Sequence, residues 1–132
     1  MKNIILILLL IVAGYMIYNY FFAEKVRKKF NKNEGLTTQD FAARQQEAQD
    51  MLRDLYQKEE SFHARFGHYT YKYDSLGVAS GNGTYYTMKV KDASTSYFEA
   101  RADGNIDNDG TKDVWTIKED GRLNNLVNDL EK

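Results

Sequence analysis

Apolar and polar positions follow three different patterns along the 132 residues of the chain. From Ile4 to Ala23, every residue except Asn19 is apolar, aromatic or glycine. At about 1.5 Å per helical residue, this run matches the hydrocarbon core of a bilayer. Tyrosines and phenylalanines are concentrated in its second half, and basic residues follow it, as is typical of a membrane interface. The first pattern predicts a transmembrane helix.

A cleaved signal peptide is the alternative for this segment, with Ile4–Ala13 as the hydrophobic region and a cut after Gly14. The apolar run continues beyond Gly14, which favours a retained anchor. We therefore expect residues 1–30 to form a membrane anchor with a basic flank. Residues 31–37, "NKNEGLT", have no apolar period and contain a glycine, so they are expected to form a linker.

The second pattern has the period of an α-helix. Apolar residues recur at spacings of three, four and seven, which places them on one stripe of an amphipathic helix from about Thr38 to Arg65. Thr37 or Thr38 suits the N-cap, and Gly67 suits the position that ends the helix. The stripe consists of Phe41, Ala48, Leu52, Leu55, Phe62 and Phe66.

Beyond Gly67 the period changes to two. The segments "TYYTMKV" (84–90), "SYFEARA" (96–102) and "VWTIK" (114–118) alternate, and turn-forming residues separate them. They predict a meander of three or four antiparallel strands, one face of which needs a cover. The expected fold class is α+β: an N-terminal transmembrane helix, then a head over residues 38–132 in which the amphipathic helix packs on an antiparallel sheet.

Composition excludes several classes of function. The net charge of −1 offers no basic surface for nucleic acid. Without cysteine, the chain has no disulfide, no thiolate metal site and no cysteine nucleophile. It contains no glycine-rich phosphate loop and no nucleophile elbow. We therefore identify no catalytic residues and no small-molecule substrate.

One polar stretch, "GNIDNDGTKD" (104–113), has the composition of a calcium loop. Asn105, Asp107 and Asp109 stand at alternate positions, as in the first half of an EF-hand. The twelfth position is Thr116 instead of a bidentate glutamate, so the stretch is not an EF-hand. Two interpretations stay open: a looser calcium site, or a polar turn, since Asp, Asn and Gly are also what tight turns prefer. The candidate metal ligands are Asp103, Asn105, Asp107, Asp109 and Asp113.

Two longer segments resemble a known family. "RQQEAQDMLRDLYQKEESFHARFGHY" (44–69) and "YYTMKVKDASTSYFEARADGNIDNDGTKDVWTIKEDGRL" (85–123) are similar to the heads of type IV pilins and of the pseudopilins of type II secretion. The resemblance covers most of the chain after the linker and includes the order of the elements. It implies an inner-membrane anchor, a head outside the cytoplasm and no enzymatic activity. Some pseudopilins bind calcium in a loop near the C-terminus. The resemblance therefore implies that the acidic stretch could bind calcium in the same way.

The N-terminal segment departs from this family. A prepilin carries a leader ending in Gly or Ala, then Phe or Met, then a glutamate five residues into the mature chain. Here no acidic residue precedes Glu24, and the fifth residue after Gly14 is Asn19. The prepilin peptidase cleavage motif is therefore lacking, which argues against ordinary filament assembly. We expect a pilin-like head on an unprocessed anchor.

The positive-inside rule and the family resemblance predict opposite orientations of the chain in the membrane. The basic residues after the span would hold the head in the cytoplasm by the positive-inside rule, whereas the resemblance places it outside. We follow the resemblance and expect a single-pass protein of the bacterial inner membrane, with its C-terminal domain in the periplasm or outside the cell.

Two functional classes result. The first is a structural component of a type IV pilus or type II secretion machine that contacts lipid and other pilin-like subunits through its N-terminal helix. The second is a monomeric, membrane-anchored binding or sensor module that uses a pilin-like head.

Overall fold

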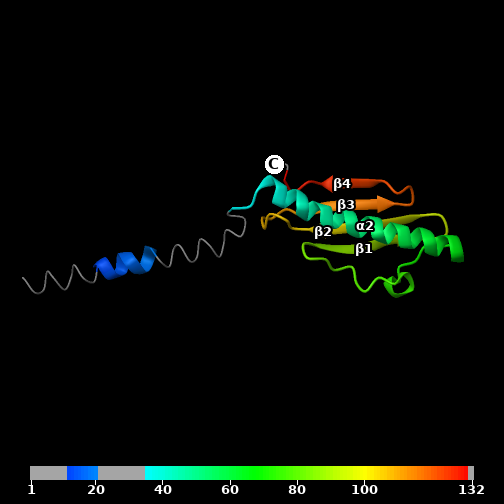
Figure 1. Cartoon of the computed structure of the whole chain (residues 1–132), viewed down its shortest axis with the longest axis horizontal. Coiled ribbons are helices and arrows are strands. Elements are labelled where there is room, and N and C mark those ends of the chain that lie inside the picture. Colours follow the sequence, from blue (N-terminus) through cyan, green and yellow to red (C-terminus); the bar gives the residue numbers. More distant parts are fainter. Residues whose placement is uncertain (1–11, 21–34, 131–132) are drawn as a thin grey trace, which may run out of the picture. The chain divides into compact units, whose positions relative to one another are not determined.

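The computed structural model describes residues 12–20 and 35–130. The chain divides into two compact units, the first ending at Gly35 and the second, the head, beginning at Leu36. The helix and strands of the head are coloured from cyan to red in Figure 1.

In the first unit, residues 12–20 are helical and all nine are exposed. Across the described parts of the chain, no helix combines the length and the apolarity needed to span a membrane. The rest of the predicted span Ile4–Ala23, and residues 31–34 of the predicted linker, lie outside the described residues. The transmembrane anchor therefore stays a prediction.

The head begins with helix α2 (Thr38–Phe66), which confirms the predicted amphipathic helix to within one residue at its end. Thr37 is the N-cap of a capping box: its side chain accepts from the N–H of Asp40, and its own N–H donates to the Asp40 carboxylate at 2.6 Å. Gly67 ends α2 with φ of +76°, a left-handed conformation that glycine adopts without strain.

A four-stranded antiparallel sheet follows a short 3-10 helix, η1 (Tyr73–Leu76). Its strands are β1 (Tyr86–Ala93), β2 (Phe98–Gly104), β3 (Asp113–Lys118) and β4 (Leu123–Val127), and they are neighbours in chain order, as Figure 1 shows. The predicted meander is thus confirmed with four strands. The alternation pattern did not place β4, because its sequence, "LNNLV", does not alternate.

α2 lies across one face of this sheet and packs against β1, β2 and β3 (Figure 1). The period-two alternation of β1 and β2 places every second side chain under the helix. The core therefore consists of the α2 stripe and the inner face of the sheet, and its main members are Ala48, Leu52, Leu55, Tyr86, Met88, Phe98, Ala100, Ala102 and Ile117.

Two glutamates of α2 face inward, although the stripe predicted only apolar residues there. Glu47 accepts the backbone N–H groups of residues 84–86 at 2.7–3.1 Å, which ties the start of β1 to the helix. Glu59 is fully buried one turn after Leu55. Phe66, which the stripe included, is 55% exposed and contacts Phe62.

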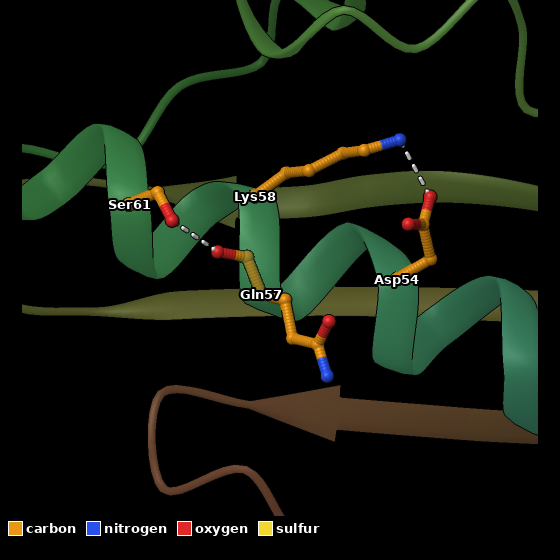
Figure 2. A network of polar contacts seen from close by, with 4 residues as sticks. All are labelled: Asp54, Gln57, Lys58 and Ser61. Atoms are coloured by element: carbon orange, nitrogen blue, oxygen red, sulfur yellow. Dashed lines mark hydrogen bonds and ion pairs between the residues drawn. The ribbon is translucent and has the colours of Figure 1, made fainter.

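The solvent side of α2 carries local polar contacts. Figure 2 shows Lys58 paired with Asp54 at 2.7 Å and the Ser61 hydroxyl donating to the carbonyl of Gln57 at 2.9 Å. Pairs four residues apart on an exposed helix face each contribute only a few tenths of a kcal/mol. They support the helix without directing it to the sheet.

Candidate metal centre

The acidic stretch forms the loop between β2 and β3, at the end of the sheet where α2 begins and the chain ends (Figure 1). Ile106 is fully buried and anchors the loop. Its carbonyl accepts from the guanidinium of Arg44, which lies over the ring of Tyr85 with its central carbon 4.8 Å from the ring centroid. Its N–H donates to Asp129, beyond β4, at 3.3 Å. The loop is thereby held by α2 on one side and by the C-terminal segment on the other.

Short-range hydrogen bonds fold the tip of the loop. The Asp107 side chain accepts from the N–H of Asp109 at 3.1 Å, and the Asp109 side chain accepts from the N–H of Thr111 at 2.6 Å. Asn105 donates its side-chain amide to the carbonyl of Asp109 at 2.7 Å. Asn108 has φ of +63°, in the left-handed region that asparagine tolerates well.

Asp113 belongs to the sheet and does not join the loop tip. It is fully buried, and one oxygen, Oδ2, accepts from the Tyr86 hydroxyl and from the Trp115 indole, both at 2.5 Å. The other oxygen accepts from the side-chain amides of Gln45 and Asn125, both at 3.2 Å, and from the N–H of Asp129 at 3.1 Å. Both oxygens act as acceptors, so this carboxylate is saturated by protein donors.

Gly104 makes room for this network. A Cβ at Gly104 would lie 2.6 Å from a ring carbon of Tyr86 and 2.7 Å from the carbonyl oxygen of Tyr85. Real side chains do not approach so closely, so only glycine lets the Tyr86 ring lie where its hydroxyl reaches Asp113.

Of the five residues predicted as metal ligands, the structure brings Asp107 and Asp109 together. Asp103 forms an ion pair with Arg101 at 2.5 Å on the sheet. Asn105 donates within the loop, and Asp113 is held by its donors in the sheet.

The third acidic member of the cluster is Asp129, which sequence reasoning missed. Asp107, Asp109 and Asp129 each offer a carboxylate oxygen, and these three atoms lie within 4.8 Å of one another. Two oxygens that both lie 2.3–2.6 Å from one calcium ion can be at most about 5 Å apart, so the spacing permits a shared ion. Asp129 follows β4 in "VNDL" and has no motif around it; only the pairing of β3 with β4 brings it to the loop.

The environment of Asp129 disfavours a negative charge. Its side chain is 1% exposed, Oδ2 accepts from Ile106, and Oδ1 has no hydrogen-bond partner. Burial raises the pKa of the Asp129 carboxyl, and the neighbouring Asp107 and Asp109 raise it further. A positive ion at the cluster would remove this conflict.

The remaining chemistry of the head is sparse. Within the described residues, Asp107, Asp109 and Asp129 are the only group of three or more His, Cys, Asp or Glu side chains that could hold a metal ion. His63 stacks on Tyr69 and hydrogen-bonds to the carbonyl of Thr95 at 2.8 Å. A shallow pocket of about 190 Å³ lies between the last turns of α2 and η1.

Comparisons with known proteins rest on structure alone. No family model and no curated protein matches the chain. A crystal structure of the Neisseria meningitidis non-core minor pilin PilV matches with a TM-score of 0.58 and 23% sequence identity, over 72% of this chain and 95% of PilV. The head has a pilin-like fold.

This match supports the fold class and assigns no function to individual residues. Since the unit ending at Gly35 is only about a quarter of the chain, a match over 72% must lie mainly in the head. The α+β head that the sequence predicts, with its helix on an antiparallel sheet, is confirmed as pilin-like. At 23% identity the likeness shows the fold alone.

Proposed function

We propose that this chain is a non-enzymatic structural component of a bacterial envelope machine related to the type IV pilus or to type II secretion. The observation that carries the proposal is the pilin-like fold of the head, shared with a protein described as a minor pilin. The apolar run Ile4–Ala23 anchors the chain in the inner membrane and packs against other pilin-like subunits. The head lies in the periplasm or outside the cell.

Photo-crosslinking in living cells tests this role. A photoreactive amino acid replaces Ile17, which lies exposed on the helical segment 12–20. We expect adducts with other pilin-like proteins of the same membrane, identified by mass spectrometry. Ile17→Phe, which is equally apolar but not photoreactive, is the matched control. An absence of protein adducts, together with a monomer in detergent, contradicts the structural role and favours an anchored binding or sensor module.

A reporter fused after Lys132 tests the topology. We expect a reporter that is active only outside the cytoplasm to report activity. Activity of a cytoplasm-only reporter would mean that the basic residues after the span set the orientation, as the positive-inside rule alone predicts.

We further propose that a calcium ion stabilises the head at the acidic loop. The three clustered carboxylates and the unpartnered oxygen of Asp129 support this part of the proposal. An ion that binds the folded state alone adds about 2.7 kcal/mol to the free energy of unfolding at a hundredfold excess over Kd. Thermal melts of the full chain in detergent, with calcium and with chelator, should differ by several degrees; superimposable curves contradict calcium binding.

A further inference from the structure

The segment after β4 is attached to the head by polar contacts that meet at Asp129. The backbone N–H of Asp129 donates to Asp113, and the side chain of Asn128 accepts from Gln45 at 3.0 Å. Leu130 is half-buried against the core. We call residues 128–130 the tail. These contacts place the Asp129 side chain inside the protein and facing the β2–β3 loop.

That placement leaves one polar atom unsatisfied. Asp129 is 99% buried, its Oδ1 has no hydrogen-bond partner, and its Oδ2 accepts from the backbone N–H of Ile106. Oxygens of Asp107 and Asp109 lie within 4.8 Å of the cluster's Asp129 oxygen. Of the three carboxylates only that of Asp129 is buried, and at this distance the two loop carboxylates repel a negative charge on it. Asp129 lacks the set of protein donors that surrounds Asp113.

We infer that a divalent cation of the calcium class bridges Asp107 and Asp109 of the loop to Asp129 of the tail, and that this bridge fastens the tail to the head. Hard divalent cations take oxygen ligands from carboxylates and backbone carbonyls, and a spacing under 4.8 Å allows one ion to bind all three groups. The inference rests on the calcium binding proposed above and assigns its ligands. It excludes Asp103, which pairs with Arg101, and Asp113, which is saturated by donors.

The consequence is that the cation controls how firmly the tail is held. With the ion bound, the orphan oxygen and both loop carboxylates have a common partner. Without it, the buried Asp129 is opposed by two like charges, and the tail opens more often. A loop residue therefore governs the exchange behaviour of a segment about twenty positions away, which an ion held by the loop alone would not produce.

The experiment combines calorimetric calcium titration with hydrogen exchange of the full chain in detergent. Four proteins are compared: wild type, Asp129→Asn, Asp107→Asn and Asp103→Asn. Asp103→Asn is the matched control, since it removes a nearby carboxylate outside the cluster. We expect calcium affinity to fall roughly ten-fold or more in Asp129→Asn and Asp107→Asn and to stay unchanged in Asp103→Asn. At calcium about ten times Kd, exchange in the tail peptide should slow roughly ten-fold in wild type and not in Asp107→Asn.

Each result distinguishes the bridge between loop and tail from calcium binding by the loop alone. If Asp129→Asn keeps wild-type affinity and calcium has no effect on tail exchange, the bridge is overturned and the ion binds to the loop alone. Loss of affinity in Asp103→Asn assigns the ion to a different ligand set and also overturns it. If the wild type does not bind calcium, both the bridge and the calcium part of the proposed function are overturned. The structural role is tested separately by the crosslinking experiment. Asp107 is not buried in the core, so Asp107→Asn decides the matter even if Asp129→Asn does not fold.

Discussion

Asp113 and Asp129 are both almost completely buried, and the backbone N–H of Asp129 donates to the Asp113 carboxylate, yet the surroundings of the two side chains are opposite. Asp113 collects five protein donors from α2, β1, β3, β4 and the tail. Asp129 has one donor, an orphan oxygen and two acidic neighbours. The same type of side chain thus has a complete set of hydrogen-bond donors in the sheet and an incomplete set beside the loop. The difference teaches that burial alone does not mark a cation site; an unpartnered oxygen together with acidic neighbours does.

The largest expected effect comes from breaking the completed network. Asp113→Ala leaves the Tyr86 hydroxyl and the Trp115 indole without their acceptor, along with three other donors. Because each unsatisfied buried donor costs about 1–3 kcal/mol and the losses overlap, we expect roughly 3–5 kcal/mol of destabilisation. Urea denaturation in chelator measures it. Tyr86→Phe removes one donor and should cost only about 1 kcal/mol; equal costs for the two variants would mean that Asp113 is not the centre of the network.

A smaller loss should follow from crowding that network without changing any charge. Gly104→Ala places a Cβ against the Tyr86 ring and the Tyr85 carbonyl, so the ring must move away from Asp113. We expect about 1–3 kcal/mol of destabilisation by the same measurement. Gly110→Ala is the matched control, because nothing lies within 4 Å of the added carbon there and φ is not positive. A neutral Gly104→Ala would show that the Tyr86 contact adapts freely.

Glu59 is a third buried carboxyl that can be compared with Asp113 and Asp129. Replacing it should change the free energy of unfolding less than the substitutions above. Its Oε2 accepts from the N–H of Thr70 at 3.1 Å, and its Oε1 has no partner. Burial raises the pKa of Glu59, and the Thr70 hydrogen bond and the histidines His63 and His68 only partly oppose this. Within the described residues Glu59 has no acidic cluster around it, so a proton is the expected partner where Asp129 has a cation.

The sign of the pH effect follows from the raised pKa of Glu59. A folded-state pKa above the unfolded value of 4.5 means that the native state binds the proton more tightly. The Glu59 contribution to stability is therefore fully present below pH 4.5 and is lost as pH rises through the folded-state pKa. Glu59→Gln should flatten that part of the stability–pH curve, because the amide does not titrate. Urea denaturation across this pH range measures the curves, and identical slopes for wild type and Glu59→Gln would contradict a raised pKa.

Periodicity predicted the fold of the head well, because its core is built from repeating apolar positions. Leu52, Leu55, Phe98 and Ala100 are buried where the helical and alternating patterns place them. The alternation pattern did not place β4, because its sequence "LNNLV" does not alternate between apolar and polar residues. Glu59 escaped prediction because a polar residue on the core side of a helix has no local signal.

The candidate site was predicted only as far as local sequence determines it. Asp107 and Asp109 lie in one turn, so the loop motif located them. Asp113, four residues beyond Asp109, looks like a loop ligand in sequence but begins β3, and strand geometry turns it into the sheet. Asp129 is brought in by the β3–β4 pairing, a long-range contact that no spacing rule reveals.

A crystal structure of the protein grown with calcium chloride tests the central claim most directly. The account predicts one ion at the end of the sheet, bound at about 2.3–2.6 Å by oxygens of Asp107, Asp109 and Asp129, with Asp113 still holding its five donors. An ion coordinated by Asp103 or Asp113, or an ion-free cluster at saturating calcium, would contradict it.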